Sequence, residues 1–453
     1  MPTNNFLSLY THHFVRVAVA APLLVLADVD FNVRQTIDLA RQAVAAGAVV
    51  ALFPELGLTG YSNDDLFHQS ALLNAANDGL KVLLEESKKL PLLMLVGMPL
   101  MHEDQLFNVG IAMLQGKILG VVPKTYLPNY REFYEKRQFA SAADTRSDEI
   151  NLLGQRVPFG SQLIFTAENF YGFKLAVEIC EDLWSPLPPS TLATLAGATV
   201  IANLSASNAT IGKADYRHEI CATQSGKCVA AYVYSAAGQG ESTTDLAWDG
   251  HAMIFENGSE LAQSQRYCNK AQLICADIDL ERLGNERMRI TSFRDTARLH
   301  KNTLDGFRTI HFSLPIPQEK VLLQREVERF PYVPASAAKR DERCFEAYHI
   351  QVQGLTQRLK SSGLEKIVIG ISGGLDSTHA LIVAAKAMDE LGLRRENILA
   401  FTMPGYATSD HTLKNARDLM KSLKVTASEL DIRPSCEQML RDIGHAFSDG
   451  KPV

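Results

Sequence analysis

KLAVEICEDLW, residues Lys174–Trp184, joins a short apolar run directly to polar residues. A run of this length with a polar boundary is typical of a buried β-strand that ends in a loop. Two further runs end in the same way, because VVALFP precedes Glu55 and ILGVVP precedes Lys124. Side chains converge where strand ends open into loops, so Cys180, Glu55 and Lys124 are candidates for one site.

Similar runs recur through the first 290 residues, between segments with helical spacing of their apolar residues. Short turns such as 115–117 and 256–258 join some neighbours, which is typical of hairpins. Hairpins mixed with helical crossovers predict an α/β domain with more than one sheet. The predicted strands are 16–21, 48–53, 92–98, 110–114, 118–122, 174–179, 199–204, 229–235, 252–255 and 272–277.

The texture of the sequence changes between residues 291 and 345, where prolines (HFSLPIPQE, 311–319) and charged clusters predominate. We interpret this segment as an interdomain connection that lies over a surface. A βαβ pattern follows, with strands at 366–371, 398–402 and 428–432 and helices at 378–391 and 410–423. The predicted domains are therefore 1–290 and 346–453.

Length and composition exclude several classes of protein. With 453 residues, the chain corresponds to roughly three domains of average size. A formal charge of -6 provides no large positive field, so we expect no nucleic-acid partner. The longest apolar runs are about half the roughly 20 residues that a membrane span requires, and the N-terminus lacks a signal-peptide pattern. Seven scattered cysteines argue against a disulfide framework, and we expect a cytoplasmic protein without membrane partners.

The three residues at the strand ends offer a coherent chemistry, although each alone has an ordinary structural interpretation. A lone Cys after a strand is usually a small buried hydrophobe, and a lone Lys or Glu usually lies in solvent. Carboxylates flank Cys180, and they raise the pKa of a nearby thiol. Such a thiol needs a base, which Glu55 can supply. It also needs a cation, which Lys124 can supply while it stabilises the oxyanion of a tetrahedral intermediate.

Longer segments around these residues carry a resemblance to a known family. FPELGLTGY (Phe53–Tyr61), PKTYLPNYREFYEKRQF (Pro123–Phe139) and EICEDLW (Glu178–Trp184) resemble the Glu–Lys–Cys signatures of the nitrilase superfamily. NLSASN (Asn203–Asn208) and AAGQGESTTDLAWDGHAMIFENG (Ala236–Gly258) are similar to a subgroup, the glutaminase domain of glutamine-dependent NAD synthetases. The resemblance implies a nitrilase-like α-β-β-α sandwich.

The resemblance implies a role for each matching position. Glu55 corresponds to the general base, Lys124 to the oxyanion-stabilising lysine and Cys180 to the nucleophile. Glu132 corresponds to a second glutamate that orients the lysine.

Three further positions are implied to bind the glutamine substrate. Tyr130 corresponds to a residue that holds it, and Ser207 and Lys213 to groups that contact its α-amino and α-carboxylate groups. Without the resemblance, Tyr130 and Ser207 would be interpreted as ordinary loop residues.

A second motif follows the apolar run IVIGI and opens a helical segment. It comprises Ser372, Gly373, Gly374, Leu375, Asp376 and Ser377. Glycines let backbone N–H groups approach an anion, and a helix N-terminus adds partial positive charge, so the loop is a candidate phosphate site. A Gly-Gly turn capped by Ser or Asp explains the same residues equally well. No GK[ST] follows, which excludes a Walker A loop.

The hexapeptide also resembles the SGGxDS pyrophosphate loop of ATP-pyrophosphatases. That resemblance implies a Rossmann-like parallel sheet of the adenine nucleotide alpha hydrolase type, with ATP bound at residues 372–377. It places Asp376 near Mg²⁺, whose preferred ligands are hard oxygens. Met403, at the end of the next predicted strand, corresponds to the region that meets the adenosine.

Together the two resemblances imply a glutamine-hydrolysing NAD synthetase that forms homo-oligomers. Ammonia from glutamine would serve the ATP-dependent amidation of nicotinic acid adenine dinucleotide. The alternatives are an amidase with a regulatory nucleotide-binding domain and a non-catalytic nucleotide-binding module in which Cys180 belongs to the core. The family continues beyond the sequence DIGHAFSDGKPV, so we expect the synthetase half to be incomplete.

Overall fold

The computed structural model describes residues 6–327 and 329–449. The chain forms two compact units, Met1–Glu326 and Val327–Val453, and each is described by itself.

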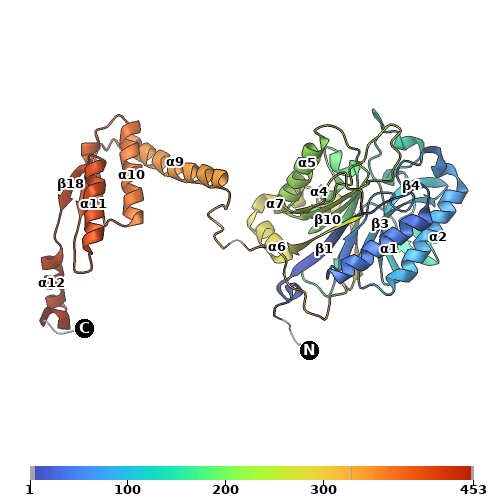
Figure 1. Ribbon diagram of the computed structural model, residues 1–453, viewed down its shortest axis with the longest axis horizontal. Coiled ribbons are helices and arrows are strands. Elements are labelled where there is room, and N and C mark those ends of the chain that lie inside the picture. The colour runs from blue at the N-terminus through green and yellow to red at the C-terminus, as the bar shows by residue number, and fades with distance from the viewer. Residues whose placement is uncertain (1–5, 328, 450–453) are drawn as a thin grey trace. The chain divides into compact units, whose positions relative to one another are not determined.

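Two main sheets face each other in the first unit (Figure 1). The first has the strand order β14-β1-β2-β3-β4-β5, and the second has the order β13-β12-β11-β10-β9-β8-β15. The strands are β1 (Phe14–Ala21), β2 (Val50–Leu52), β3 (Leu93–His102), β4 (Gln105–Leu114), β5 (Lys117–Pro123), β8 (Leu163–Ala167), β9 (Lys174–Ile179), β10 (Val200–Ser205), β11 (Ala231–Ala236), β12 (Met253–Glu256), β13 (Ser259–Gln263), β14 (Gln272–Asp279) and β15 (Arg308–Phe312). A separate hairpin joins β6 (Glu149–Leu152) to β7 (Gln155–Pro158).

Helices cover the outer face of each sheet and complete an α-β-β-α sandwich (Figure 1). Helices α1 and α2 pack on the first sheet, and α4 and α5 pack on the second. The helices of this unit are α1 (Val29–Ala45), α2 (Ser70–Ser87), α3 (Glu181–Trp184), α4 (Pro189–Leu195), α5 (Lys213–Cys228), α6 (Leu280–Arg289), α7 (Thr291–Leu299) and α8 (Lys301–Leu304).

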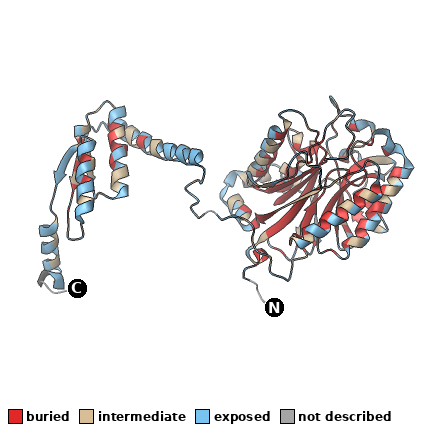
Figure 2. Cartoon of the chain, in the orientation of Figure 1, coloured by how far each residue is buried: buried red, intermediate tan, exposed pale blue. Residues whose placement is uncertain are grey.

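Strand β1 illustrates why the central strands appear in the sequence as continuous apolar runs. Val17 and Val19 point into the core between the sheets, whereas Ala18 and Ala20 point toward the helices. Both faces are therefore buried, as the red strands in Figure 2 show. A strand covered on both faces needs apolar residues at every position.

The second unit has a parallel sheet in the order β16-β17-β18. Helix α10 packs against α9 and β16, and α11 packs against β17 and β18. The strands are β16 (Ile367–Gly370), β17 (Ile398–Thr402) and β18 (Thr426–Glu429), and the helices are α9 (Ala337–Ser362), α10 (Leu375–Glu390), α11 (Asp410–Ser422) and α12 (Arg433–Asp442). The predicted fold class, a sandwich followed by a parallel-sheet unit, is confirmed.

The segment 291–345, expected to connect the domains, is structured over much of its length. It contains α7, α8 and β15, and β15 pairs in parallel with β8 at the edge of the second sheet. Arg325 then binds the buried Glu256 carboxylate at 2.6 and 2.8 Å, and the N–H of Leu9 donates to the Val321 carbonyl at 2.9 Å. The first unit thus extends to Glu326, because this segment completes its sheet edge and covers its surface.

Candidate active site

The loops that follow β2, β5 and β9 bring Glu55, Lys124 and Cys180 together in one neighbourhood of the first unit. Glu55 and Lys124 extend from the first sheet, and Cys180 extends from the second. Lys124 Nζ lies 2.6 Å from Glu55 Oε1, and both side chains are buried. The backbone N–H of Glu55 donates to the Ser205 carbonyl at the end of β10, at 3.3 Å, so this loop also bridges the two sheets.

Close packing positions the Glu55 loop against β3. A Cβ atom added to Gly97 would lie 2.5 Å from the Leu56 nitrogen and 2.7 Å from the Pro54 carbonyl oxygen. Only a residue without a side chain permits that approach. Glu55 Oε1 also accepts from Asn108 Nδ2 at 2.6 Å, whereas Glu55 Oε2 has no partner among the described residues.

Cys180 lies at a sharp bend between β9 and α3. Its φ of 44° falls in the left-handed region, which is strained for a residue with a side chain. Its N–H donates to the Leu204 carbonyl at 2.9 Å and to Asn203 Oδ1 at 3.2 Å. These contacts hold the bend, and α3 then presents backbone N–H groups directly after the thiol.

The carboxylate that contacts Lys124 from the following loop is Glu135 and not Glu132, which corrects the expectation from the sequence. Glu135 Oε1 accepts from Lys124 Nζ at 2.7 Å and from the Tyr61 hydroxyl at 2.8 Å. Glu132 instead accepts from Asn208 Nδ2 at 2.9 Å. The Glu135 N–H donates to the Pro128 carbonyl at 3.0 Å, so the loop folds back and returns the later glutamate to the lysine.

The electrostatics of the cluster follow from its burial. Burial, followed by repulsion from the Glu55 carboxylate, raises the pKa of the Cys180 thiol. Burial alone would lower the pKa of Lys124, but the Glu135 and Glu55 carboxylates raise it well above its usual value. Burial, opposed by Lys124, raises the pKa of Glu135 to about 7. The lysine therefore stays cationic, and the thiol needs a base to lose its proton.

A cleft of about 580 Å³ adjoins Cys180, and it contains all three residues expected to bind substrate. The Tyr130 hydroxyl donates to Glu181 at 2.8 Å. Lys213 Nζ lies 5.1 Å from the centre of the Trp184 ring and also contacts Asn208 Oδ1. Ser207 Oγ is buried and has no partner among the residues described, so it is available to a ligand.

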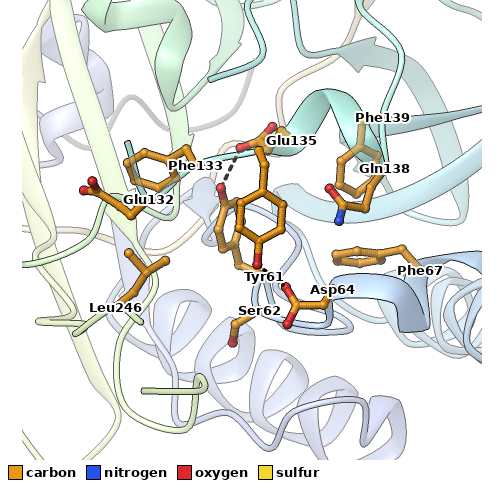
Figure 3. Close-up of a pocket in the computed structure, with 11 residues that line it drawn as sticks. Tyr61, Ser62, Asp64, Phe67, Glu132, Phe133, Glu135, Gln138, Phe139 and Leu246 are labelled. Carbon is orange, nitrogen blue, oxygen red and sulfur yellow. Dashed lines mark hydrogen bonds between the residues drawn. The ribbon is translucent and has the colours of Figure 1, made fainter. Parts of the chain in front are cut away.

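A smaller pocket of about 60 Å³ lies beside Glu135 (Figure 3). Figure 3 shows the Tyr61 hydroxyl directed at the Glu135 carboxylate, with Phe67 and Phe139 along one side. Glu132 and Phe133 line both this pocket and the larger cleft. Tyr61 therefore contacts the Lys124 cluster from the side of this small pocket.

Sequence reasoning missed Tyr61, Glu135 and Glu181 as members of the site. Glu181 appeared only as a charge beside Cys180, yet it lines the cleft and binds Tyr130. Tyr61 and Glu135 both occur inside the quoted motifs, so the available signal was their presence in the same segments as Glu55 and Lys124. Periodicity could not select them, because both lie in loops.

In the second unit, the Ser372–Ser377 loop joins β16 to α10. Gly373 has φ of 80°, and an added Cβ atom would lie 2.0 Å from the Thr412 carbonyl oxygen. The Gly374 N–H donates to Ser372 Oγ at 3.2 Å, and Ser372 Oγ lies 3.0 Å from Ser377 Oγ. Gly374 is the N-cap residue of α10, and the Ser377 hydroxyl donates to its carbonyl oxygen at 3.3 Å. These bonds among the two serines and Gly374 are compatible with a capped turn and with a phosphate site.

Asp376 is exposed in the first turn of α10, and Met403 follows β17 and is half exposed. In the ranges 6–327 and 329–449, no cluster of three His, Cys, Asp or Glu side chains suited to a metal is present. Helices in these ranges also lack the length and apolar character needed to cross a membrane.

Comparisons with known proteins support these two units. The carbon-nitrogen hydrolase family model matches residues 16–288, and the NAD synthase model matches residues 347–450. A protein named glutamine-dependent NAD(+) synthetase from Mycobacterium bovis is 49% identical over 449 residues, covering 99% of this chain and 66% of the relative. A relative of the same name from Thermotoga maritima is 27% identical over 439 residues, covering 97% and 69%.

Among solved structures, a glutamine-dependent NAD(+) synthetase from Cytophaga hutchinsonii matches with a TM-score of 0.52 and 20% identity, covering 96% of this chain and 68% of that one. This likeness concerns the fold. The chain spans 66% of the length of its mycobacterial relatives. The family model that matches more than half of its residues shows that this chain belongs to the carbon-nitrogen hydrolase family.

Proposed function

We propose that the first unit hydrolyses the side-chain amide of glutamine through Cys180. The observation that carries this proposal is the buried Glu55–Lys124–Glu135 cluster beside a thiol that opens into a cleft. Lys124 keeps its positive charge in that setting, which is what an oxyanion-stabilising group needs. The names of the curated relatives support the same substrate.

Glutamine binds in the cleft through groups of opposite charge. The Glu181 carboxylate and the Tyr130 hydroxyl bind the α-ammonium group, and Lys213 and the Ser207 hydroxyl bind the α-carboxylate. The ring of Trp184 holds Lys213 in place. A substrate without either charged α-group would lose one of these contacts.

In the first chemical step, Glu55 Oε2 takes the proton of the Cys180 thiol, and the sulfur attacks the amide carbon. Lys124 and backbone N–H groups after Cys180 stabilise the oxyanion. Collapse of the intermediate breaks the C–N bond, and the proton held by Glu55 goes to the leaving ammonia. Water then attacks the thioester, Glu55 takes its proton, and the thiol regains a proton as glutamate leaves.

We infer that the second unit binds ATP at residues 372–377 and uses the ammonia. ATP would adenylate the carboxylate of nicotinic acid adenine dinucleotide and release pyrophosphate, and ammonia would displace AMP to give NAD. The Gly373–Gly374 backbone and the Ser372 and Ser377 hydroxyls cradle phosphate, and Met403 contacts the adenosine. Asp376, an exposed carboxylate next to that cradle, would hold a Mg²⁺ ion, which would supply positive charge against the phosphates. We also propose that the enzyme is homo-oligomeric and lies in the cytoplasm.

Glutamate release from glutamine, compared between the parent and Cys180→Ala, tests the first half. We expect a loss of at least 10³-fold, because the nucleophile is removed while the cleft remains. The matched control is Cys221→Ala, which truncates a buried thiol of α5 that does not line the cleft. Glutamate release by the Cys180 variant at the parent rate would exclude the proposed mechanism.

A further inference from the structure

Asp182 lies two residues after Cys180 and is buried, yet it does not line the cleft. Its Oδ1 atom accepts from the N–H groups of Thr125 at 3.1 Å and Tyr126 at 2.8 Å. Its Oδ2 atom accepts from the N–H of Ile179 at 2.9 Å. One carboxylate thus binds the two residues after Lys124 and the residue before Cys180.

These bonds connect two different sheets. Lys124 follows β5 of the first sheet, and Cys180 follows β9 of the second. Apolar side chains make most of the contact between the sheets, and such contacts are weakly directional. A hydrogen bond prescribes both a distance and an angle, so Asp182 constrains the two loops more tightly than packing does.

The setting of Asp182 is costly for a carboxylate. Among the described residues, no Lys or Arg side chain forms a hydrogen bond with it, and Lys124 acts on it only through longer-range attraction. Burial, followed by repulsion from Glu178, raises the pKa of Asp182 to about 8, and the N–H groups of Ile179 and Tyr126 oppose that shift. Placing a carboxyl group in a buried site without a cationic partner costs free energy, which favours a geometric role over a stabilising one.

We propose that Asp182 is a positioning residue that sets the distance between the Lys124 ammonium group and the Cys180 sulfur. The inference rests on the proposed glutaminase function, in which that distance decides how well the oxyanion is stabilised. A misplacement of about 1 Å can lower the rate of such a step about 100-fold. Asp182 touches neither the thiol nor the cleft, so it acts through the two loops.

Asp182→Asn tests the inference with almost no change of volume. The amide presents its own N–H₂ group to one of the N–H donors, so one of the two loops loses its bond. We expect kcat for glutamate release to fall at least 10-fold while KM changes less than 3-fold, because Glu181, Ser207 and Lys213 keep their places. Alkylation of Cys180 by iodoacetamide forms no oxyanion. Its rate, measured by mass spectrometry, should therefore stay within 3-fold of the parent rate.

Asp277→Asn is the matched control, because Asp277 is a buried carboxylate that accepts from the Gln324 N–H at 2.7 Å and pairs with Arg16. It lies on β14 and contacts none of the catalytic side chains. We expect a lower melting temperature with kcat within 2-fold of the parent. An equal loss of kcat in Asp182→Asn and Asp277→Asn would show that Asp182 acts only through general stability, and it would overturn the inference.

Asp182→Ser provides a second variant, because its smaller side chain leaves room for a water molecule to accept from the freed N–H groups. We again expect kcat to fall at least 10-fold while the rate of Cys180 alkylation stays within 3-fold of the parent rate. A kcat within 3-fold of the parent in either folded variant, or a parallel loss of alkylation, would refute the positioning role. Failure of both variants to fold would also refute it, by assigning Asp182 to stability. A parent chain that releases no glutamate would instead reject the proposed function, and the inference with it.

Discussion

At the scale of single residues, the site is built around one buried lysine and two buried carboxylates. Lys124 contacts Glu55 and Glu135, and it is the cation that both share. The resulting cluster holds one more negative charge than positive charge when both carboxylates are ionised. Burial, with added repulsion from Glu55, raises the pKa of Glu135, whereas the two carboxylates outweigh burial and raise the pKa of Lys124.

The raised pKa of Glu135 predicts a pH dependence of stability. The folded chain binds a proton on this group up to about pH 7, whereas the unfolded chain releases it near pH 4.5. The unfolding free energy should therefore fall as pH rises from about 4.5 to about 7, by up to about 3 kcal/mol, and then level off. Glu135→Gln cannot titrate at this position and should show a smaller slope, while other buried carboxyls with raised pKa values, such as Asp182, keep their share.

Denaturant unfolding of the parent and of Glu135→Gln at half-unit steps between pH 4.5 and 8 would measure the difference. Glu132→Gln is the matched control, because Glu132 is only partly buried and does not contact Lys124. Equal slopes in the parent and the Glu135 variant would show that the carboxyl titrates normally in the fold.

At the scale of elements, short loops place each reactive group at a strand end. Glu55, Lys124 and Cys180 each follow a continuous apolar run, so the sequence was sufficient to locate them. Glu135 was not predicted, because its approach to Lys124 depends on the bond between its N–H and the Pro128 carbonyl. No periodic pattern encodes such a loop contact.

Strand β15 shows a second limit of prediction from the sequence. It has only five residues, follows two short helices and precedes the prolines of residues 313–319, all of which are typical of a connection. Its partner, β8, lies far away in the sequence, and only that pairing makes the segment a strand. Short edge strands are therefore the elements that pattern analysis is least able to predict.

The close packing of the loop between β16 and α10 predicts that ATP binding is sensitive to substitution of Gly373. An added methyl group would meet the Thr412 carbonyl oxygen at 2.0 Å, so Gly373→Ala should displace the loop from α11. We expect ATP binding, measured by calorimetry on the parent and the variant, to weaken at least 10-fold, since the phosphate cradle depends on that loop.

Gly363→Ala is the matched control for the substitution at Gly373. Gly363 also has a positive φ, of 68°, but apart from its chain neighbours no atom of the described residues lies within 4 Å of an added Cβ. The variant should lose about 1 kcal/mol of stability, because alanine is strained in the left-handed region, and should keep its ATP affinity. If both alanine variants bind ATP like the parent, the contact with Thr412 does not shape the site.

At the scale of the whole molecule, the first unit could end at either of two positions, and truncation at each position tests which is right. The sequence pattern places the end of the first domain near residue 290, whereas the compact unit extends to Glu326. The intervening residues supply β15, the buried side chains of Phe312 and Leu314, and the pairing of Arg325 with Glu256. A chain that ends at 290 lacks all of these, and one that ends at 326 keeps them.

Removal of residues 291–326 should destabilise the first unit severely. Burial of Phe312 and Leu314 contributes about 2 kcal/mol each, and the exposed edge of β8 and the loss of one partner of Glu256 add to that cost. A net stability of about 5 to 15 kcal/mol leaves little reserve against such a loss. We therefore expect residues 1–326 to melt cooperatively and residues 1–290 to melt at least 10 °C lower or to aggregate. Thermal unfolding followed by circular dichroism distinguishes them, and equal melting temperatures would place the boundary near residue 290 after all.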